Sequence, residues 1–247
     1  MQGNMMRGQR TGTALFVILL WIGSPAGGNP DTVGAEPDRW ADYNTEGLKA
    51  YRQQHYEQAI QLFHDAISSL TPDSQPHAQE AMTLNNLAAA YEGLGRYDEA
   101  ELHYLKSLTI VEQIQGPNHP DLVLGLTNLG ILHRKRGRPA QAERLYQRSL
   151  RIMETVLGEA HPHLIPPLLD LAHVSQEQGA FGRSEDYYKR ALKIGETELP
   201  VAHHQTQSIR MQYASLLRHL NRSEEADDLQ NKARRELRSP EQDELGE

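Results

Sequence analysis

The sequence predicts an all-α protein, a right-handed α-solenoid of five stacked helix-turn-helix units with a period of about 42 residues. A small residue recurs once in each period: Gly47, Ala88, Gly130, Ala172 and Ala214. A second small position keeps the same spacing: Ala59, Ala100, Ala142, Ser184 and Ala226. Four residues later, an aromatic ring occurs in four units and is absent from the fifth: Phe63, Tyr104, Tyr146 and Tyr188, then Gln230. Agreement at several positions with one period indicates a repeated structural unit.

The first helix of each unit is amphipathic. In the second unit, the stripe at i, i+3, i+4 and i+7 consists of Leu84, Leu87, Ala88 and Tyr91. Gly95 follows this helix, and a glycine there adopts the left-handed conformation that ends helices without a steric penalty. The matching residues in the other units are Gln54, Gly137, Gly179 and Asn221. Asparagine is the next-best residue for this conformation, so the first unit alone departs from the pattern.

The second helix of each unit carries two small residues and a ring at i, i+7 and i+4, as in Ala100, Ser107 and Tyr104. Small residues allow neighbouring helices to approach closely, and the ring then fills the space between units. We therefore expect these positions to form the core of the stack.

One set of residues in the second unit forms a recognisable motif: Leu87-Ala88-x-x-Tyr91, Gly95-x-Tyr97, Ala100, Tyr104, Ser107 and the linker Gly116-Pro117-Asn118-His119-Pro120-Asp121. This motif resembles the tetratricopeptide repeat (TPR), in the subtype found in kinesin light chains. The resemblance covers residues 41–238 and implies repeats at about 41–74, 81–115, 123–157, 165–199 and 207–238. The unit is longer than the usual repeat of about 34 residues, which predicts about two additional turns on each second helix. The heptad region of a light chain is absent, so the resemblance implies fold and binding mode but not motor transport.

The segments outside the repeats have other predicted roles. Arg7 and Arg10 precede the apolar stretch 14–22, and the small residues of 24–26 follow, which is typical of a secretory signal peptide over residues 1–26. We therefore expect an exported protein, periplasmic in a Gram-negative bacterium and otherwise secreted; an uncleaved anchor is the alternative. Residues 27–40 are predicted to be a flexible linker, and residues 239–247 a disordered acidic tail.

Composition excludes several kinds of chemistry. The chain has no cysteine, so it has no disulfide, no cysteine-ligated zinc and no thiol nucleophile. Its net charge of −8 disfavours binding to nucleic acid through a basic surface. The mean hydropathy of −0.65 is atypical of a protein with several membrane spans. No phosphate-binding loop, nucleophile elbow or zinc-protease motif occurs, so we expect a protein that is not an enzyme and needs no cofactor.

Four histidines recur with the period of the repeats: His77, His119, His161 and His203. Equivalent positions in stacked helix pairs lie about 10 Å apart, whereas zinc needs nitrogen ligands at about 2.1 Å. Pro120 and Pro162 directly follow two of these histidines, which places proline at the start of a helix. We therefore interpret the histidines as structural linker residues and predict no metal site.

Polar residues two positions before the first small residue are candidates for a peptide-binding groove: Thr45, Asn86, Asn128, Asp170 and Gln212. First helices line the concave face of such solenoids, and amide side chains both donate and accept hydrogen bonds. A row of amides can therefore bind the backbone of an extended peptide. Alternatively, they bond only to water or to a neighbouring helix. Asp170 interrupts the row and favours a peptide donor or a cation.

A local excess of positive charge lies near the end of the third repeat's first helix. Arg134 and Lys135 fall near groove-lining positions, and we expect them to anchor acidic side chains or a terminal carboxylate. A solvated charged face is the alternative. The carboxylate clamp of one class of tetratricopeptide repeats is not matched, because Asn85 and Thr127 occupy positions where its basic residues are expected.

The sequence thus predicts a non-catalytic exported scaffold that binds extended peptides or partner proteins in its concave groove. The alternatives are a structural role through self-association and an accessory subunit of an envelope enzyme. The partner and the oligomeric state stay open at this point.

Overall fold

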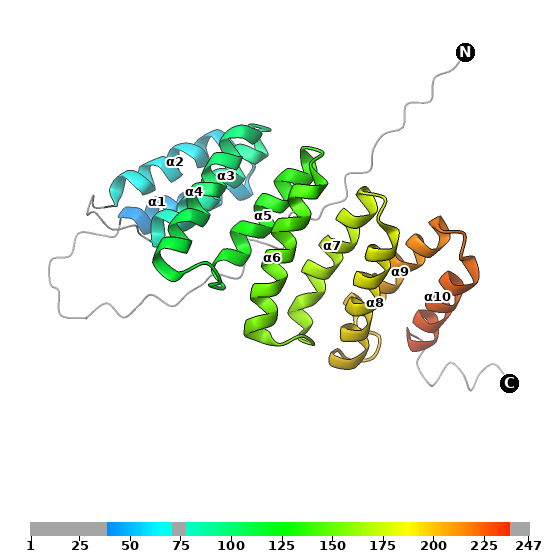
Figure 1. Cartoon of the computed structure of the whole chain (residues 1–247). Coiled ribbons are helices and arrows are strands. Elements are labelled where there is room, and N and C mark those ends of the chain that lie inside the picture. Colours follow the sequence, from blue (N-terminus) through cyan, green and yellow to red (C-terminus); the bar gives the residue numbers. More distant parts are fainter. Residues whose placement is uncertain (1–38, 71–77, 238–247) are drawn as a thin grey trace, which may run out of the picture. The chain divides into compact units, whose positions relative to one another are not determined.

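The computed structural model describes residues 39–70 and 78–237, and every regular element within these ranges is helical (Figure 1). The elements are α1 (Arg39–Arg52), α2 (Tyr56–Ser69), α3 (Ala78–Gly93), α4 (Tyr97–Gln115), α5 (Leu122–Lys135), α6 (Pro139–Leu157), the 3-10 helix η1 (Pro162–Leu164), α7 (Ile165–Glu177), α8 (Phe181–Glu198), α9 (His204–His219) and α10 (Ser223–Leu237). The predicted signal segment, most of the predicted linker, the predicted acidic tail and His77 lie outside the described residues. Within the described ranges, no helix combines the length and apolar character needed to cross a membrane.

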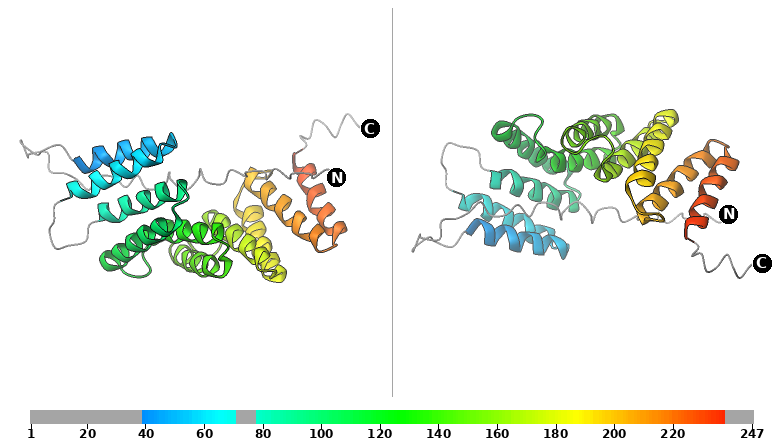
Figure 2. Two further views of the ribbon diagram at one scale, coloured as in Figure 1. Left: turned by 90° about the horizontal axis from the view of Figure 1, so that it is seen from above. Right: turned by 90° about the horizontal axis from the view of Figure 1, so that it is seen from below.

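Consecutive helices form five hairpins, α1 with α2 through α9 with α10, and the second helix of each hairpin packs on the first helix of the next (Figures 1 and 2). No hairpin can bury its apolar face alone, so stability is a sum over neighbouring interfaces. This arrangement confirms the predicted all-α solenoid.

The repeated small and aromatic residues form the core, as the pattern predicts. Ala59, Ala100, Ala142, Ser184 and Ala226 are completely buried. The rings follow them into the interior, and Phe63, Tyr104, Tyr146 and Tyr188 are also buried. Contact is so close that a Cβ atom added at Gly130 would lie 2.5 Å from Cε1 of Tyr146. Glycine at this position therefore sets the distance between the two helices of the third unit.

The lengths of the second helices agree with the predicted two-turn extension in the inner units. α4 and α6 have 19 residues each, and α8 has 18. α2 and α10, in the terminal units, are shorter at 14 and 15 residues. The extension is thus a property of the second helices that have a complete unit on both sides.

The turns inside the hairpins have the predicted left-handed residue. Gly95, Gly137 and Gly179 have φ angles of 75°, 69° and 71°, and Asn221 has 60°. Gln54 also adopts this conformation, with φ of 62°. The first unit therefore has the same turn without the glycine, and Gln54 carries the steric cost that glycine avoids.

His161 and His203 cap the helical segments that follow them, and His119 makes the same bond just before α5. Nδ1 of His119 accepts a hydrogen bond from the backbone N–H of Asp121 at 3.3 Å. His161 and His203 repeat this bond two residues ahead, to His163 at 3.2 Å and to Gln205 at 3.3 Å. A side chain that accepts from an unpaired N–H at the start of a helix stabilises that end. This geometry explains the histidine period as a structural linker feature.

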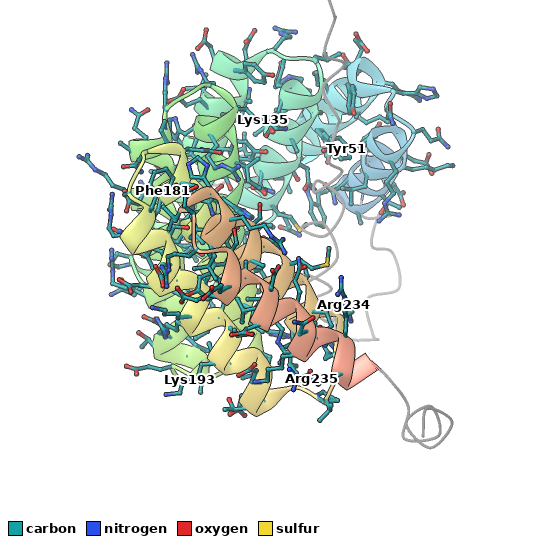
Figure 3. The ribbon with its side chains drawn as sticks, turned by 90° about the vertical axis from the view of Figure 1, so that its right-hand side faces the viewer. Tyr51, Lys135, Phe181, Lys193, Arg234 and Arg235 are labelled. Atoms are coloured by element: carbon teal, nitrogen blue, oxygen red, sulfur yellow. The ribbon has the colours of Figure 1, made fainter. Side chains whose placement is uncertain are left out.

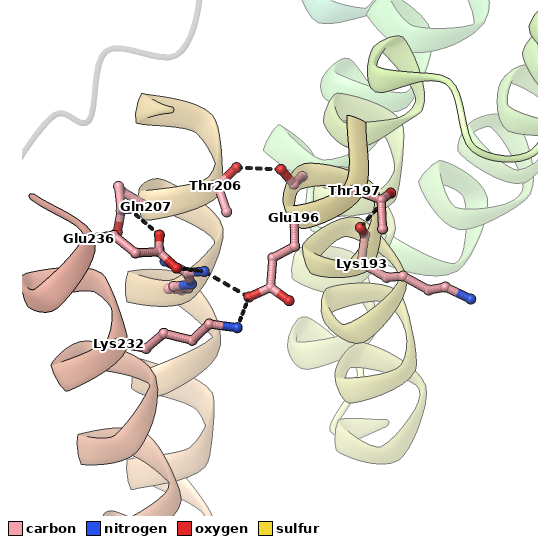
Figure 4. Close-up of polar contacts among 9 residues, drawn as sticks. Lys193, Glu196, Thr197, Thr206, Gln207, Lys232 and Glu236 are labelled. Carbon is pink, nitrogen blue, oxygen red and sulfur yellow. Dashed lines mark hydrogen bonds and ion pairs between the residues drawn. The ribbon is translucent and has the colours of Figure 1, made fainter. Parts of the chain in front are cut away.

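Ion pairs between second helices also follow the period. Arg148 pairs with Glu112 at 2.6 Å, and Arg190 with Glu154 at 2.5 Å. Lys232 forms the next pair of the series with Glu196 at 2.8 Å, drawn in Figure 4. Arg148 and Arg190 each also donate to a linker carbonyl, of Pro117 and Glu159 respectively. These contacts fix the register of each unit on the one before.

Candidate binding face on the first helices

In the first three units, the first helices lie closer to one another than the second helices do. α1 contacts α3 and α3 contacts α5, whereas successive second helices reach one another through the long charged side chains described above. Because the first helices of these units are the closer set, they occupy the inner side of the bend between the units. The inner face of these helices is therefore the candidate binding face.

The predicted asparagine row connects neighbouring repeats. Nδ2 of Asn86 donates to Oδ1 of Asn44 at 3.2 Å, and Nδ2 of Asn128 donates to Oδ1 of Asn85 at 3.2 Å. We call this pair of bonds the amide ladder. It uses a donor of Asn86 and of Asn128, while the Oδ1 atoms of both residues accept no hydrogen bond within the described residues. Each of these two bonds, or rungs, thus joins neighbouring units and leaves one amide oxygen able to accept a further hydrogen bond.

The fourth repeat interrupts the ladder. Asp170 stands where Asn86 and Asn128 stand in the preceding units, and it is half-buried on α7. Its carboxylate forms no hydrogen bond or ion pair within the described residues. Burial raises the pKa of Asp170 to about 6, and the positive charge of Arg134 opposes this rise. On this face, the Asp170 carboxyl group is therefore desolvated and has no hydrogen-bond partner among the residues that the structure describes.

The fifth repeat restores a polar link of another kind. Oε1 of Gln212 lies 2.7 Å from Nε2 of His173, and Nε2 of Gln212 donates to Oγ of Ser208 at 3.0 Å. Since an amide oxygen can only accept, His173 donates through Nε2. Burial lowers the pKa of His173, and the hydrogen bond that His173 donates to Gln212 acts in the opposite direction. Both polar atoms of the Gln212 amide are thus engaged.

The two predicted basic anchors are paired with acidic residues of neighbouring repeats. Arg134 contacts Glu177 with two nitrogens, Nε at 3.0 Å and Nη2 at 2.8 Å from Oε1. Nζ of Lys135 lies 2.6 Å from Oε1 of Glu92. Lys135 is labelled in Figure 3. An acidic ligand would have to displace Glu177 or Glu92, so binding of such a ligand by Arg134 and Lys135 stays a prediction.

Apolar side chains lie between the polar positions. Met82, Leu124 and Leu169 on α3, α5 and α7 are half-buried, and Pro166 is exposed. Met211 on α9 is 65% exposed, which is unusual for a large apolar side chain without a partner. A face that combines apolar side chains with free amide acceptors can contact both the side chains and the backbone of a peptide.

Sequence reasoning missed the partners of the predicted residues. Asn44, Asn85, Glu92, Glu177 and His173 complete the inter-repeat bonds of this face, and none stood among the predicted groove residues. A search for polar pairs separated by about one period would have found them. Within residues 39–70 and 78–237, no three His, Cys, Asp or Glu side chains are grouped so that they could hold a metal ion.

Comparison with known proteins shows which fold this chain shares. The family model described as tetratricopeptide repeat matches residues 79–155 and 125–197. One similar structure is that of a Podosopora anserina protein described as a kinesin light chain with TPR-like repeats nearly identical to one another. Its sequence is 18% identical to this chain, the TM-score is 0.71, and the match covers 83% of this chain and 100% of that chain. BtubC (BKLC) from P. vanneervenii is 15% identical to this chain, with a TM-score of 0.70, and the match covers 79% of this chain and 78% of that chain.

A third similar structure is residues 41 to the end of MamA from Desulfovibrio magneticus RS-1, 13% identical with a TM-score of 0.58, covering 83% of this chain and 100% of that chain. No curated protein matches the sequence. The chain thus folds as an all-α TPR solenoid and is similar to kinesin-light-chain-type repeats.

Proposed function

We propose that this protein is an exported, non-catalytic scaffold that binds extended segments of partner proteins on the inner face of its first helices. TPR solenoids generally mediate contacts between proteins, and the fold of this chain is of that kind. Export rests on the sequence pattern of residues 1–26.

The observation that carries the proposal is the amide ladder. Its free oxygens lie among half-buried apolar side chains on one continuous face, and a peptide backbone N–H supplies the donor that they lack. Because these acceptors are held by hydrogen bonds between repeats, little side-chain entropy is lost when a peptide binds.

A selection experiment tests this proposal. A library of random dodecapeptides is selected on the purified full chain, and the affinities of the enriched peptides are measured by fluorescence anisotropy. The double variant Asn86→Ala/Asn128→Ala should bind them at least about ten-fold more weakly, since each lost hydrogen bond is worth about 1 kcal/mol.

The matched control is Gln113→Ala/Gln141→Ala, which removes two exposed amides from the second helices α4 and α6. Thermal unfolding of both variants is followed in parallel, because the ladder also joins repeats. Equal peptide affinity of the two double variants would contradict binding at the ladder.

End-to-end self-assembly is the less favoured alternative. The outer face of α10 is polar and exposes Arg234 and Arg235 (Figure 3), and its only fully buried residue among those described is Ala226. A terminal unit with a polar face does not present the apolar surface that another unit would cover. Light scattering should therefore give the mass of a monomer at all concentrations tested.

A further inference from the structure

The two rungs of the amide ladder leave hydrogen-bonding groups unused on both of their residues. Asn44 and Asn85 accept the rung bond through Oδ1, and neither side chain makes another hydrogen bond within residues 39–70 and 78–237. An asparagine amide has one carbonyl oxygen and an NH2 group with two donors. The Nδ2 donors of Asn44 and Asn85 are therefore unused, as are the Oδ1 acceptors of Asn86 and Asn128.

These unused groups keep contact with solvent. Asn44 and Asn85 are each 6% exposed, yet their Nδ2 atoms are not among the polar atoms that lie sealed without a partner in the described part of the chain. Oδ1 of the half-buried Asn86 and Asn128 is not sealed either. The hydroxyl of Tyr146, by contrast, is sealed. A ligand can therefore reach one donor and one acceptor at each rung.

The packing of the repeats does not require asparagine at positions 44 and 85. The equivalent residues of the later units are Thr127, Leu169 and Met211, and each of these units still packs on the one before. A nearly buried amide with unused donors costs free energy that an apolar residue avoids. The rung bond itself needs only an acceptor, which an aspartate would also supply. Asn44 and Asn85 are therefore better explained by a ligand that uses their donors.

One donor beside one acceptor matches the backbone of a single peptide residue. Its N–H can donate to Oδ1 of Asn86 or Asn128, and its C=O can accept from Nδ2 of Asn44 or Asn85. Every residue except proline offers this pair of groups, whatever its side chain. Each rung can therefore bind one residue of a peptide through two hydrogen bonds.

The distance between the rungs favours one peptide conformation. Equivalent positions of neighbouring repeats lie about 10 Å apart. In a polyproline II helix, every third residue points in the same direction after about 9 Å, whereas a β-strand repeats its direction after about 7 or about 13 Å. A polyproline II backbone also has no internal hydrogen bonds, so its N–H and C=O groups are free to bind. The two rungs thus fit two residues three apart in such a peptide.

We propose that Asn44 and Asn85 are peptide-binding residues, each of which acts with the asparagine of the next repeat to bind the N–H and the C=O of one residue in a polyproline II peptide. Asn44 acts with Asn86, and Asn85 acts with Asn128. The third repeat has Thr127 in place of this asparagine, so two residues of the peptide are bound in this way. This inference rests on the proposed function, because it names the backbone groups and the conformation that the same face selects.

Aspartate at the two positions separates binding from folding. In Asn44→Asp/Asn85→Asp, each carboxylate can still accept the rung bond, but the donor for the peptide carbonyl is replaced by an acceptor. Peptides enriched from the dodecapeptide library should bind this variant at least about ten-fold more weakly in fluorescence anisotropy. A purely structural role predicts unchanged affinity, because the rungs are kept. The matched control Asn118→Asp/Asn231→Asp introduces the same charges at exposed asparagines and should leave the affinity unchanged.

A scan of the peptide backbone tests the same contacts on the unsubstituted protein. N-methylation of one peptide residue at a time removes one N–H donor. Affinity should fall about five-fold at each of two residues that lie three apart, which is the effect of losing one hydrogen bond. The same two residues should stay sensitive in the aspartate variant, because Oδ1 of Asn86 and Asn128 is kept. Thermal unfolding shows whether that variant is folded, and the scan decides alone where it is not.

The outcomes separate this inference from the proposed function. Unchanged affinity of Asn44→Asp/Asn85→Asp would overturn the inference while the proposed function stands, since that function depends on Asn86 and Asn128. Sensitive peptide residues that lie two or four apart, or a peptide with none, would also overturn it. A library that yields no binding peptide would overturn the proposed function and the inference with it.

Discussion

The terminal repeat contains a buried ion pair where the inner repeats have an apolar contact. Leu84, Leu126 and Leu168 recur one period apart on the first helices, and Arg210 is the next member of the series. Ile110, Ile152 and Ile194 recur on the second helices and are followed by Glu236. Arg210 is 1% exposed, and it contacts Glu236 at 2.6 and 2.9 Å and Glu196 at 2.7 Å. Figure 4 labels the two glutamates.

Removing one member of this pair should be costly. Arg210→Leu leaves Glu236 with a single hydrogen bond, from Gln207 at 3.3 Å, in a partly buried site. Breaking a buried ion pair costs about 3–5 kcal/mol, and we expect about 3 kcal/mol because Glu236 keeps some contact with solvent. Glu236→Ile leaves Arg210 with Glu196 alone and should cost about 2 kcal/mol.

The double variant Arg210→Leu/Glu236→Ile recreates the apolar contact of the inner repeats. Well-packed apolar replacements of buried ion pairs are often neutral or stabilising, so its stability should lie within about 1 kcal/mol of the unsubstituted protein. Glu196 is not left unpaired, because Lys232 contacts it at 2.8 Å. The two substitutions should therefore show a coupling energy of at least about 2 kcal/mol.

Native-state hydrogen exchange of α9 and α10 measures this effect, because repeat proteins open unit by unit. Both single variants should exchange faster in α10, and the double variant should recover protection. Arg234→Leu, an exposed substitution on α10, is the control. Unchanged protection in Arg210→Leu, or a double variant as labile as the single ones, would refute this account of the terminal repeat.

Three further predictions concern single positions. Because the folded pKa of Asp170 is about 6, above the unfolded value of about 3.9, ionised Asp170 lowers stability as pH rises between these values. Asp170→Asn should therefore stabilise the fold by about 1 kcal/mol at pH 8 but not at pH 3.5 in urea titrations. His203→Ala removes the acceptor for the Gln205 N–H and should cost about 1 kcal/mol, with the faster exchange confined to the start of α9. Gly130→Ala should cost about 1–3 kcal/mol of stability, despite the better helix propensity of alanine, because its Cβ would overlap the Tyr146 ring. The melting temperature should therefore fall, and a rise in melting temperature would show that the ring moves aside.

Much of the fold could be predicted because each unit of a solenoid is defined by local sequence and by its nearest neighbours. The buried positions of Ala100 and Tyr104 and the left-handed turn at Gly95 follow from helix periodicity and backbone sterics. The role of the linker histidines as structural residues also followed from spacing, whereas their hydrogen bonds to the backbone two residues ahead required the structure.

The candidate site was predictable only in position. The period places Asn86, Asn128 and Asp170 on one face of the first helices. It does not say which of their polar atoms are hydrogen-bonded to a neighbouring repeat, because the partners lie about one full period away and depend on side-chain geometry. Asn86 and Arg134 proved to be engaged with neighbouring repeats, and Asp170 did not.

By itself, then, the sequence determined the repeated hairpin, its length and its core, since these depend on contacts within one unit and its neighbour. Tertiary structure alone decided the polar chemistry of the inner face. Long polar side chains from adjacent units can pair in several ways, and only their packed arrangement shows that Asn86 and Asn128 are bonded to neighbouring repeats, whereas the carboxyl group of Asp170 accepts no hydrogen bond within the described residues.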